Sequence, residues 1–353
     1  MANDNIVVDT AERILADLAD PGDIIRANSD VWKPALWQAL EQAGLTLAWV
    51  ADVHGGAGVA LDDGFAVLRA AGRAAIAVPL AETMLAGWLL GQGGLASVTG
   101  AMSVVPARPG DRITLDAAGR LHGVARHVPF ATDVNHFAVL ADGTDGVFVA
   151  LIARSACTIA QGVNLAGEAS EAVTFAAAAP LRIARLPDGI DHAALMLMGA
   201  AVRAQQMAGA LETMLQISVR YATERVAFEK PIAKFQAVQH NLARLGGETA
   251  AAVAAAASAA EAISAGSIGD AAGMLEIAAA KIRCGEAAQA GAAIAHQVHG
   301  AIGFTDEHIL HRLTLRALAW RDDFGSESYW GVRLGQFVAM RGADELWPLV
   351  ASR

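Results

Sequence analysis

Three side chains in the stretch RYATERVAFEKPIAKFQAVQHNLARL, residues 220–245, could bind a phosphate and a purine. Arg225, Phe228 and Gln236 would supply a fixed cation, an aromatic face and an amide. They should cluster about a turn, because a helix is expected to end near Phe228 and Pro231 is tolerated in the first turn of the next. That next helix would have the apolar stripe Phe235, Val238, Leu242 and Leu245. A plain helix-turn-helix corner with solvated charges explains the same residues, so this pattern alone assigns no function.

A second segment, RDDFGSESYW at residues 321–330, gathers three acids after a long helical stretch. A positioned carboxylate can act as a general base. The acids also have a structural interpretation. Asp322 and Asp323 would favour the N-terminal end of a helix dipole, and Ser326 and Glu327 would form its N-cap and first turn.

The histidines could suggest a metal site, since two pairs of them are spaced three residues apart. These pairs are His296 with His299 and His308 with His311. No acid or cysteine completes either pair at a recognised metal spacing. We therefore expect no metal.

Composition narrows the class of protein. A chain of 353 residues that is 54% hydrophobic should fold into two or three packed units. Its net charge of −10 argues against nucleic acid and anionic membranes as partners and favours a small molecule or a protein. Cys157 and Cys284 are far apart, the first residues lack the basic and apolar regions of a secretory signal, and no apolar run reaches the ~20 residues of a membrane helix. A cytoplasmic protein is expected.

The elements that must position these residues fall into three parts, which we place at 1–98, 99–186 and 187–353. Eight of the ten prolines lie at or before Pro187, so the last part should be helical. Its long Ala-rich runs, one of them stopped at Gly300, favour closely packed bundle helices. The middle part has short β-rich runs such as NHFAVLA and GVFVALI between turns. The first part has amphipathic helical periods separated by Gly-rich breaks.

Two of these motifs carry a resemblance to a known family. The 220–245 stretch resembles the ERxxFGxxIxxFQxxQxxLA segment of acyl-CoA dehydrogenases, and QVHGAIGFTDEHILHR, residues 297–312, resembles their Gln-x-x-Gly-Gly-x-Gly-Phe loop. Ala301 replaces the second glycine of that loop, and Glu229 replaces the glycine after Phe228. A third stretch, residues 54–74, resembles an N-terminal Gly-Gly-x-Gly turn. The resemblance implies a mainly α fold with an N-terminal helical domain, a middle β-barrel and a C-terminal four-helix bundle.

The resemblance also implies chemistry. A carboxylate removes the α-proton of an acyl-CoA thioester, FAD takes a hydride from the β-carbon, and electrons pass to electron-transfer flavoprotein. Carried over residue by residue, Arg225 would meet the FAD pyrophosphate, and Phe228 and Gln236 its adenosine end. The residues Gln297, Gly300 and Ala301 would meet the same FAD. All six would reach across to the cofactor of a neighbouring subunit in a dimer or tetramer.

Other family features are missing. The segment 102–116 lacks the Thr-Glu-Pro-x-Ala-Gly-Ser-Asp loop that holds a subunit's own flavin, and His127 and Pro129 stand where a Trp-Ile-Thr strand covers it. Proline has no N–H to donate. Counting from Gln297 puts Phe324 at the position of the base. Asp323 is the substitute after a one-residue shift, although its side chain is one methylene shorter than that of Glu.

The alternative base position of the family, early in the first long C-terminal helix, falls on Gly199 and Ala200. The sequence resembles the shorter subunits of α2β2 acyl-CoA dehydrogenases of bacterial steroid degradation. Three hypotheses stay open. The chain is a base-lacking subunit that shares FAD with a catalytic partner, a self-sufficient homo-oligomer that uses Asp323, or a non-enzymatic member with a role in assembly or regulation.

Overall fold

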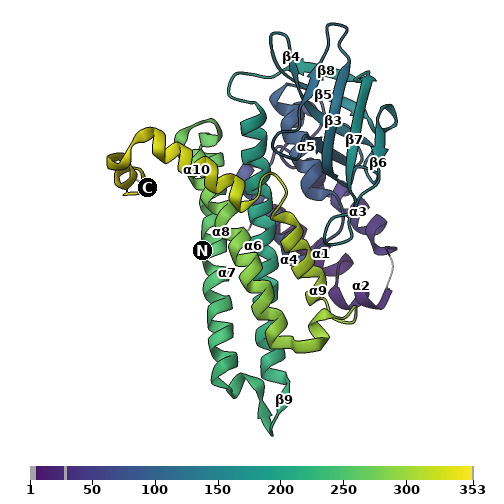
Figure 1. The fold of residues 1–353 in the computed structure, drawn as a ribbon. Coiled ribbons are helices and arrows are strands. Elements are labelled where there is room, and N and C mark those ends of the chain that lie inside the picture. Colours follow the sequence, from purple (N-terminus) through teal and green to yellow (C-terminus); the bar gives the residue numbers. More distant parts are fainter. Residues whose placement is uncertain (1–4, 28–29, 352–353) are drawn as a thin grey trace.

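The structure, a computed structural model, describes residues 5–27 and 30–351, and its elements follow the expected order of helices, strands and helices (Figure 1). The first helices are α1 (Ile6–Leu18), α2 (Pro21–Ala27), α3 (Trp32–Gln42), α4 (Leu61–Ala74) and α5 (Leu80–Gln92), with short 3-10 turns at Leu45–Leu47 and Asp52–His54. Helix α5 is buried from Leu80 to Leu90, which is typical of a helix that is apolar on most sides. Sequence reasoning gave no expectation for α5.

The middle part is one sheet. Its strands are β1 (Met102–Val105), β2 (Ile113–Leu115), β3 (Leu121–Pro129), β4 (His136–Gly143), β5 (Gly146–Ala153), β6 (Thr158–Ala160), β7 (Ser170–Ala178) and β8 (Arg182–Arg185). They pair in the order β6-β7-β3-β2-β4-β5-β8, with β1 parallel to β4. The expected β-rich runs are confirmed as strands. The expected central β domain is confirmed, and within the described chain its short, largely exposed end strands β6 and β8 do not pair with each other.

The last part holds the long helices. These are α6 (His192–Glu224), α7 (Gln236–Ser264), α8 (Ala271–His299), α9 (Leu310–Trp320), α10 (Glu327–Arg341) and α11 (Leu346–Ala351). Helices α6, α7 and α8 pack along one another, and α9 lies against α6 and α8 (Figure 1). Helix α8 ends at its C-cap Gly300, as expected. No helix within the described ranges is long and apolar enough to cross a membrane.

Glycines let α4 and α6 approach closely. A Cβ on Gly72 would lie 2.2 Å from the backbone oxygen of Gln206, and one on Gly209 would lie 2.1 Å from that of Arg69. Any side chain at either position would force the helices apart. This contact fixes α6, which carries part of the candidate site, against the N-terminal helices.

The expected turn after α6 differs from the structure in two ways. Helix α6 ends at Glu224 instead of near Phe228, and α7 begins at Gln236 instead of at Pro231. A hairpin, β9 (Val226–Ala227) with β10 (Lys230–Pro231), lies between them, followed by a 3-10 turn at Ile232–Lys234. Phe228 and Glu229 form the hairpin turn with φ of 53° and 66°. Two consecutive residues with positive φ make the turn that closes two-residue hairpins, and neither residue here is the glycine that usually signals such a turn.

Candidate functional site

The corner between α9 and α10 places the ring of Phe324 in the protein interior. Ser326 caps α10, accepting a hydrogen bond from the Tyr329 N–H at 3.4 Å, so the expected N-cap is confirmed. Phe324 has φ of 53° and is 1% exposed. Its ring packs on Gly199 of α6, where an added Cβ would lie 2.2 Å from a ring carbon. The two positions at which the family resemblance expects a base are therefore in contact, and the phenyl ring fills the space between them.

Four hydrogen bonds fix this corner. The Phe324 N–H donates to the Ala107 carbonyl of the loop after β1 at 3.1 Å, and Trp330 Nε1 donates to the Phe324 carbonyl at 3.0 Å. Lys281 of α8 donates from Nζ to the carbonyls of Arg321 at 2.6 Å and Gly325 at 2.9 Å. The position of the Phe324 ring is thus set by backbone hydrogen bonds to the β domain and to α8, in addition to the packing of the ring itself.

Asp323 is held by a buried arginine. Arg203, one helical turn after Gly199, donates from Nε to Asp323 Oδ2 at 3.0 Å and from Nη2 to Glu82 Oε1 of α5 at 2.6 Å. Its Nη1 donates to Gln206 Oε1 at 2.6 Å. The carboxylate of Asp323 therefore faces the guanidinium group instead of lying at the end of α10, and this arrangement opposes its use as a base.

Sequence reasoning missed three buried charges, Glu82, Arg203 and Lys281, whose exposed fractions are 3%, 2% and 0%. Each stands inside a helix whose neighbouring residues are apolar on most sides, as in LAETMLAGWLL and EIAAAKIRC. A charge in such a run must find a partner in the interior, because an unpaired buried charge is very costly. That signal could have located these residues from the sequence.

Burial lowers the pKa of Lys281 from 10.5 to about 8, although Asp323 and Glu327 oppose the shift. The unfolded chain keeps this proton until about pH 10.5, so the folded state gains stability as pH rises between the two values. We expect the free energy of unfolding of the native chain, relative to Lys281→Met, to increase by about 3 kcal/mol from pH 8 to 10.5. Urea titrations of both proteins across this range would measure it. A difference that does not change with pH would contradict the expectation.

The expected cofactor residues lie at the opposite end of α6. Arg225 is its C-cap, and Phe228 lies in the hairpin turn near β9 at the far tip of the bundle (Figure 1). Phe228 is 89% exposed and meets Phe235 edge to face, with ring centroids 6.2 Å apart. Arg225 and Gln236 are also exposed, and Arg225 pairs with no carboxylate in the described part of the chain.

A groove of about 830 Å³ on α8 and α9 contains the other three expected residues, Gln297, Gly300 and Ala301. All three are exposed. Tyr221 of α6 stacks on His299 of α8 with centroids 4.6 Å apart, so the groove and the end of α6 are adjacent. The structure therefore brings the six residues to one end of the bundle, on its outer surface.

The four histidines here form aromatic and hydrogen-bonded contacts. His296 stacks on Phe304 at 4.0 Å, and His299 lies 4.8 Å from His308. Burial, assisted by neighbouring positive charges, lowers the pKa of His308 to about 4, so this ring is neutral at neutral pH. No three histidine, cysteine or acidic side chains converge as a metal site within residues 5–27 and 30–351.

The β domain differs at the positions expected to cover a flavin. His127 is exposed with φ of 53°, and Pro129 is buried at the end of β3. The Pro129 carbonyl accepts a hydrogen bond from Ser103 Oγ at 2.8 Å. The loop after β1 is tied to β3, because Asp111 accepts from the backbone N–H of Arg126 at 2.6 Å. These residues therefore make contacts within the β domain. Position 129 offers no backbone N–H that could donate to a flavin.

Comparison with known proteins places the chain in a family. A family model for the C-terminal domain of acyl-CoA dehydrogenases matches residues 189–327. Over 309 residues the chain is 30% identical to acyl-CoA dehydrogenase FadE27 of Mycobacterium tuberculosis, an alignment that covers 80% of this chain and 82% of the relative. The chain belongs to the acyl-CoA dehydrogenase family. It is also 29% identical to acyl-CoA dehydrogenase IpdE2 of the same organism, over 88% of this chain and 89% of that relative.

The acyl-CoA dehydrogenase fold is likewise confirmed. The crystal structure of the ChsE4–ChsE5 complex from Mycobacterium tuberculosis superposes with a TM-score of 0.84, covering 95% of this chain and 96% of that chain at 22% identity. Within this acyl-CoA dehydrogenase fold, Phe324 and Gly199 lie in the interior, and the six exposed residues lie on the surface at the other end of α6. Family membership implies an FAD-dependent oxidoreductase.

Proposed function

We propose that this chain is the base-lacking subunit of an FAD-dependent acyl-CoA dehydrogenase and shares FAD with a catalytic partner chain. The observation that carries the proposal is the contact of the Phe324 ring with Gly199. A phenyl ring accepts no proton, and it leaves no room for a side chain at Gly199. Asp323, the acid next to Phe324 in the sequence, is bonded to Arg203.

The exposed residues at the other end of α6 support the sharing of a cofactor. Arg225 would pair with the pyrophosphate of an FAD held mainly by the partner, since a guanidinium group forms charge-assisted bonds with phosphate oxygens. Phe228 and Gln236 would contact its adenosine end. The groove with Gln297, Gly300 and Ala301 would contact the same cofactor. FAD held there would supply the acceptor for the hydride from the β-carbon of the acyl-CoA thioester, and electron-transfer flavoprotein would reoxidise it.

The visible absorption spectrum tests the proposal directly. The chain purified alone should be colourless, and the chain co-purified with an acyl-CoA dehydrogenase encoded beside it should be yellow and bleach on addition of an acyl-CoA thioester. A yellow isolated chain that bleaches with thioester would overturn the proposal in favour of a self-sufficient enzyme. A chain that assembles with a partner without changing its flavin content or activity would overturn it in favour of an assembly role.

Replacing Arg225 with Ala in the assembled enzyme should loosen FAD. Loss of a charge-assisted contact of about 1.5–3 kcal/mol corresponds to a roughly ten- to hundredfold weaker affinity. Flavin retained after dialysis, measured by absorbance, gives the result. Arg244→Ala is the control, because Arg244 is also exposed and lies on α7 eight residues after Gln236 but is not one of the six residues. Equal flavin retention in both variants would contradict the role of Arg225.

A further inference from the structure

A row of three aromatic rings lies behind the exposed residues proposed to contact FAD. Tyr221 of α6 stacks on His299 of α8, with ring centroids 4.6 Å apart and ring planes 28° apart. His299 also lies against His308, with ring centroids 4.8 Å apart, and His308 Nδ1 accepts from the N–H of Leu310, the first residue of α9, at 3.2 Å. The row therefore joins the ends of α6 and α8 to the start of α9, at the end of the bundle that carries β9 (Figure 1). The proposed sharing of FAD assigns no role to these rings.

The backbone of Arg225 depends on Tyr221. The Arg225 N–H donates to the Tyr221 carbonyl at 2.8 Å and so caps α6. The Arg225 carbonyl accepts from the Ile232 N–H at 2.8 Å, on the far side of the hairpin. The side chain of Arg225 is exposed, and within residues 5–27 and 30–351 it forms no hydrogen bond or ion pair. The backbone of the last α6 turn therefore determines where this guanidinium group can reach.

The ring of His299 fixes the other half of the proposed contacts. His299 is the last residue of α8 and is 3% exposed, and the groove residues Gly300 and Ala301 follow it directly. Its Nδ1 donates to the Ala295 carbonyl at 2.8 Å, which holds the ring against its own helix. Burial lowers the pKa of His299, so the ring is neutral at neutral pH and stacks on Tyr221 without a charge.

The spacing between these two halves matters because one ligand would contact both. Arg225 and Gly300 cap different helices, and α7 separates them along the chain. A charge-assisted hydrogen bond weakens when its donor is displaced, and ordering a loose group on binding lowers affinity. Two rigid rings in contact would limit both losses, because an aromatic pair stabilises one arrangement of the helices that carry it.

Ordinary packing between two helices would also bring these rings together. In that case the loss of a ring would lower stability without acting on FAD through Arg225. The two explanations therefore differ in a measurable way.

We propose that Tyr221 and His299 are positioning residues for the shared FAD, because their stack sets the spacing between Arg225 and the groove on α8 and α9. This inference rests on the proposed function and adds to it two residues that act through others. Tyr221 acts through the backbone of Arg225, and His299 acts through the backbone that leads into Gly300. The stack holds both halves at the spacing that one cofactor requires.

Amide hydrogen exchange of the isolated chain tests the link between the stack and Arg225 without FAD. Tyr221→Leu should speed exchange in residues 225–235 by about three- to tenfold, the effect of losing one aromatic pair on local opening. Tyr221→Phe should exchange as the native chain does, because a phenyl ring keeps the stack. Unchanged exchange in Tyr221→Leu, or equal acceleration in Tyr221→Phe, would overturn the inference.

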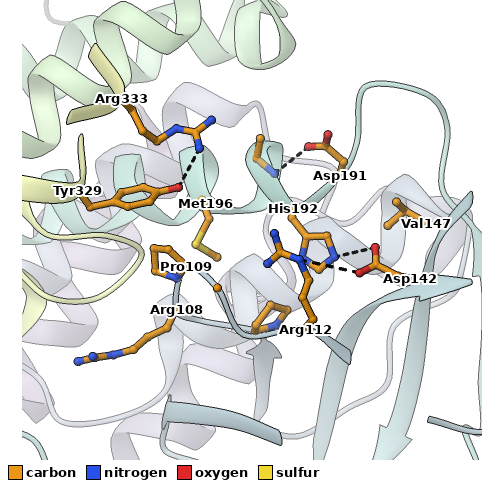
Figure 2. Close-up of a pocket in the computed structure, with 13 residues that line it drawn as sticks. Arg108, Pro109, Arg112, Asp142, Val147, Asp191, His192, Met196, Tyr329 and Arg333 are labelled. Atoms are coloured by element: carbon orange, nitrogen blue, oxygen red, sulfur yellow. Dashed lines mark hydrogen bonds and ion pairs between the residues drawn. The ribbon is translucent and has the colours of Figure 1, made fainter. Parts of the chain in front are cut away.

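Tyr329→Leu is the matched control, because Tyr329 is the other of the two tyrosines in the chain and is also partly buried. Its ring meets Trp330 edge to face, with ring centroids 5.0 Å apart. Figure 2 shows Tyr329 beside Arg333 in a cavity that is also lined by His192, the first residue of α6, at the opposite end of that helix from Tyr221. Equal effects of Tyr329→Leu and Tyr221→Leu would indicate general loosening of the fold and would overturn the inference.

FAD titration of the assembled enzyme, first freed of its flavin, tests the consequence for the cofactor. Tyr221→Leu should weaken FAD binding about three- to tenfold, and Tyr221→Phe should bind FAD as the native chain does. In the Arg225→Ala background the same Tyr221→Leu change should have almost no effect, because no guanidinium group is left to position. Additive losses in the double variant would show that Tyr221 acts independently of Arg225 and would overturn the inference.

The outcomes distinguish this inference from the proposed function. If the assembled native chain holds no FAD, the proposed function and the inference are both wrong. If Arg225→Ala loosens FAD and the Tyr221 variants do not, only the inference is wrong. His299→Leu removes the stack from the side of α8 and should reproduce both effects of Tyr221→Leu, so the test does not depend on the folding of one variant.

Discussion

Replacement of Arg203 with Met is expected to lower the free energy of unfolding by about 3–5 kcal/mol, the usual cost of breaking a buried ion pair from one side. Arg203 and Glu82 are nearly inaccessible to solvent, and their nearest atoms are 2.6 Å apart. Without Arg203 the Glu82 carboxylate would be left in an apolar interior with no cation. Urea unfolding followed by circular dichroism measures the loss.

The pH dependence of this loss of stability distinguishes the effect of the unpaired Glu82 charge from the effect of lost packing. Burial raises the pKa of Glu82 even beside Arg203, whose charge lowers it. In Arg203→Met that opposing charge is gone, so the folded state holds a proton that the unfolded state releases above about pH 4.5. The variant should therefore be less destabilised at pH 5 than at pH 8. The double variant Arg203→Met with Glu82→Leu should recover most of the stability at pH 8. A loss that is independent of pH and is not recovered would refute the charge explanation.

Phe324→Glu is expected to give no acyl-CoA oxidation when the chain is expressed alone. A restored carboxylate would lie near Arg203, whose guanidinium carbon is 5.8 Å from the present ring centre, and would pair with it. It would also face a β domain with Pro129 at the position expected to donate to a flavin. Loss of the buried ring should in addition cost about 3–5 kcal/mol of stability.

The measurement is thioester-dependent reduction of an artificial electron acceptor, together with flavin content. Phe324→Leu is the matched control, since it replaces the ring with a smaller apolar side chain and adds no charge. Stability should fall in both variants, and activity should be absent in both. Sustained oxidation by Phe324→Glu alone would show that the β domain can hold flavin and that only the base has been lost.

The sequence predicted the order of elements and most strands and helices because their periods and breakers are local signals. The Ser326 N-cap and the Gly300 stop were confirmed for the same reason. The hairpin at Phe228 and Glu229 was missed because both residues adopt a left-handed backbone that is rarely formed without glycine. The order in which the strands pair could not be predicted, because pairing between distant strands is a long-range property that no local pattern encodes.

The site was partly predictable. Counting along the chain placed Phe324 and Gly199 at the two positions where the family has its base. Only the fold shows that the two residues are in contact. Asp323 was interpreted as a helix-end charge because the sequence does not reveal that Arg203, 120 residues away, points toward it. The stack of Tyr221 on His299 joins two helices that are distant in the sequence, so no local motif could have identified it.

The length of helix α6 bears on how the sequence of such a chain can diverge during evolution. Gly199 and Arg225 are 26 residues apart in sequence, which at ~1.5 Å per residue places them about 39 Å apart along one rigid rod. Substitutions that far apart with no shared partners act additively. A duplicated gene can therefore lose the proton acceptor at one end while selection preserves the nucleotide contacts at the other, and neither change needs a compensating mutation.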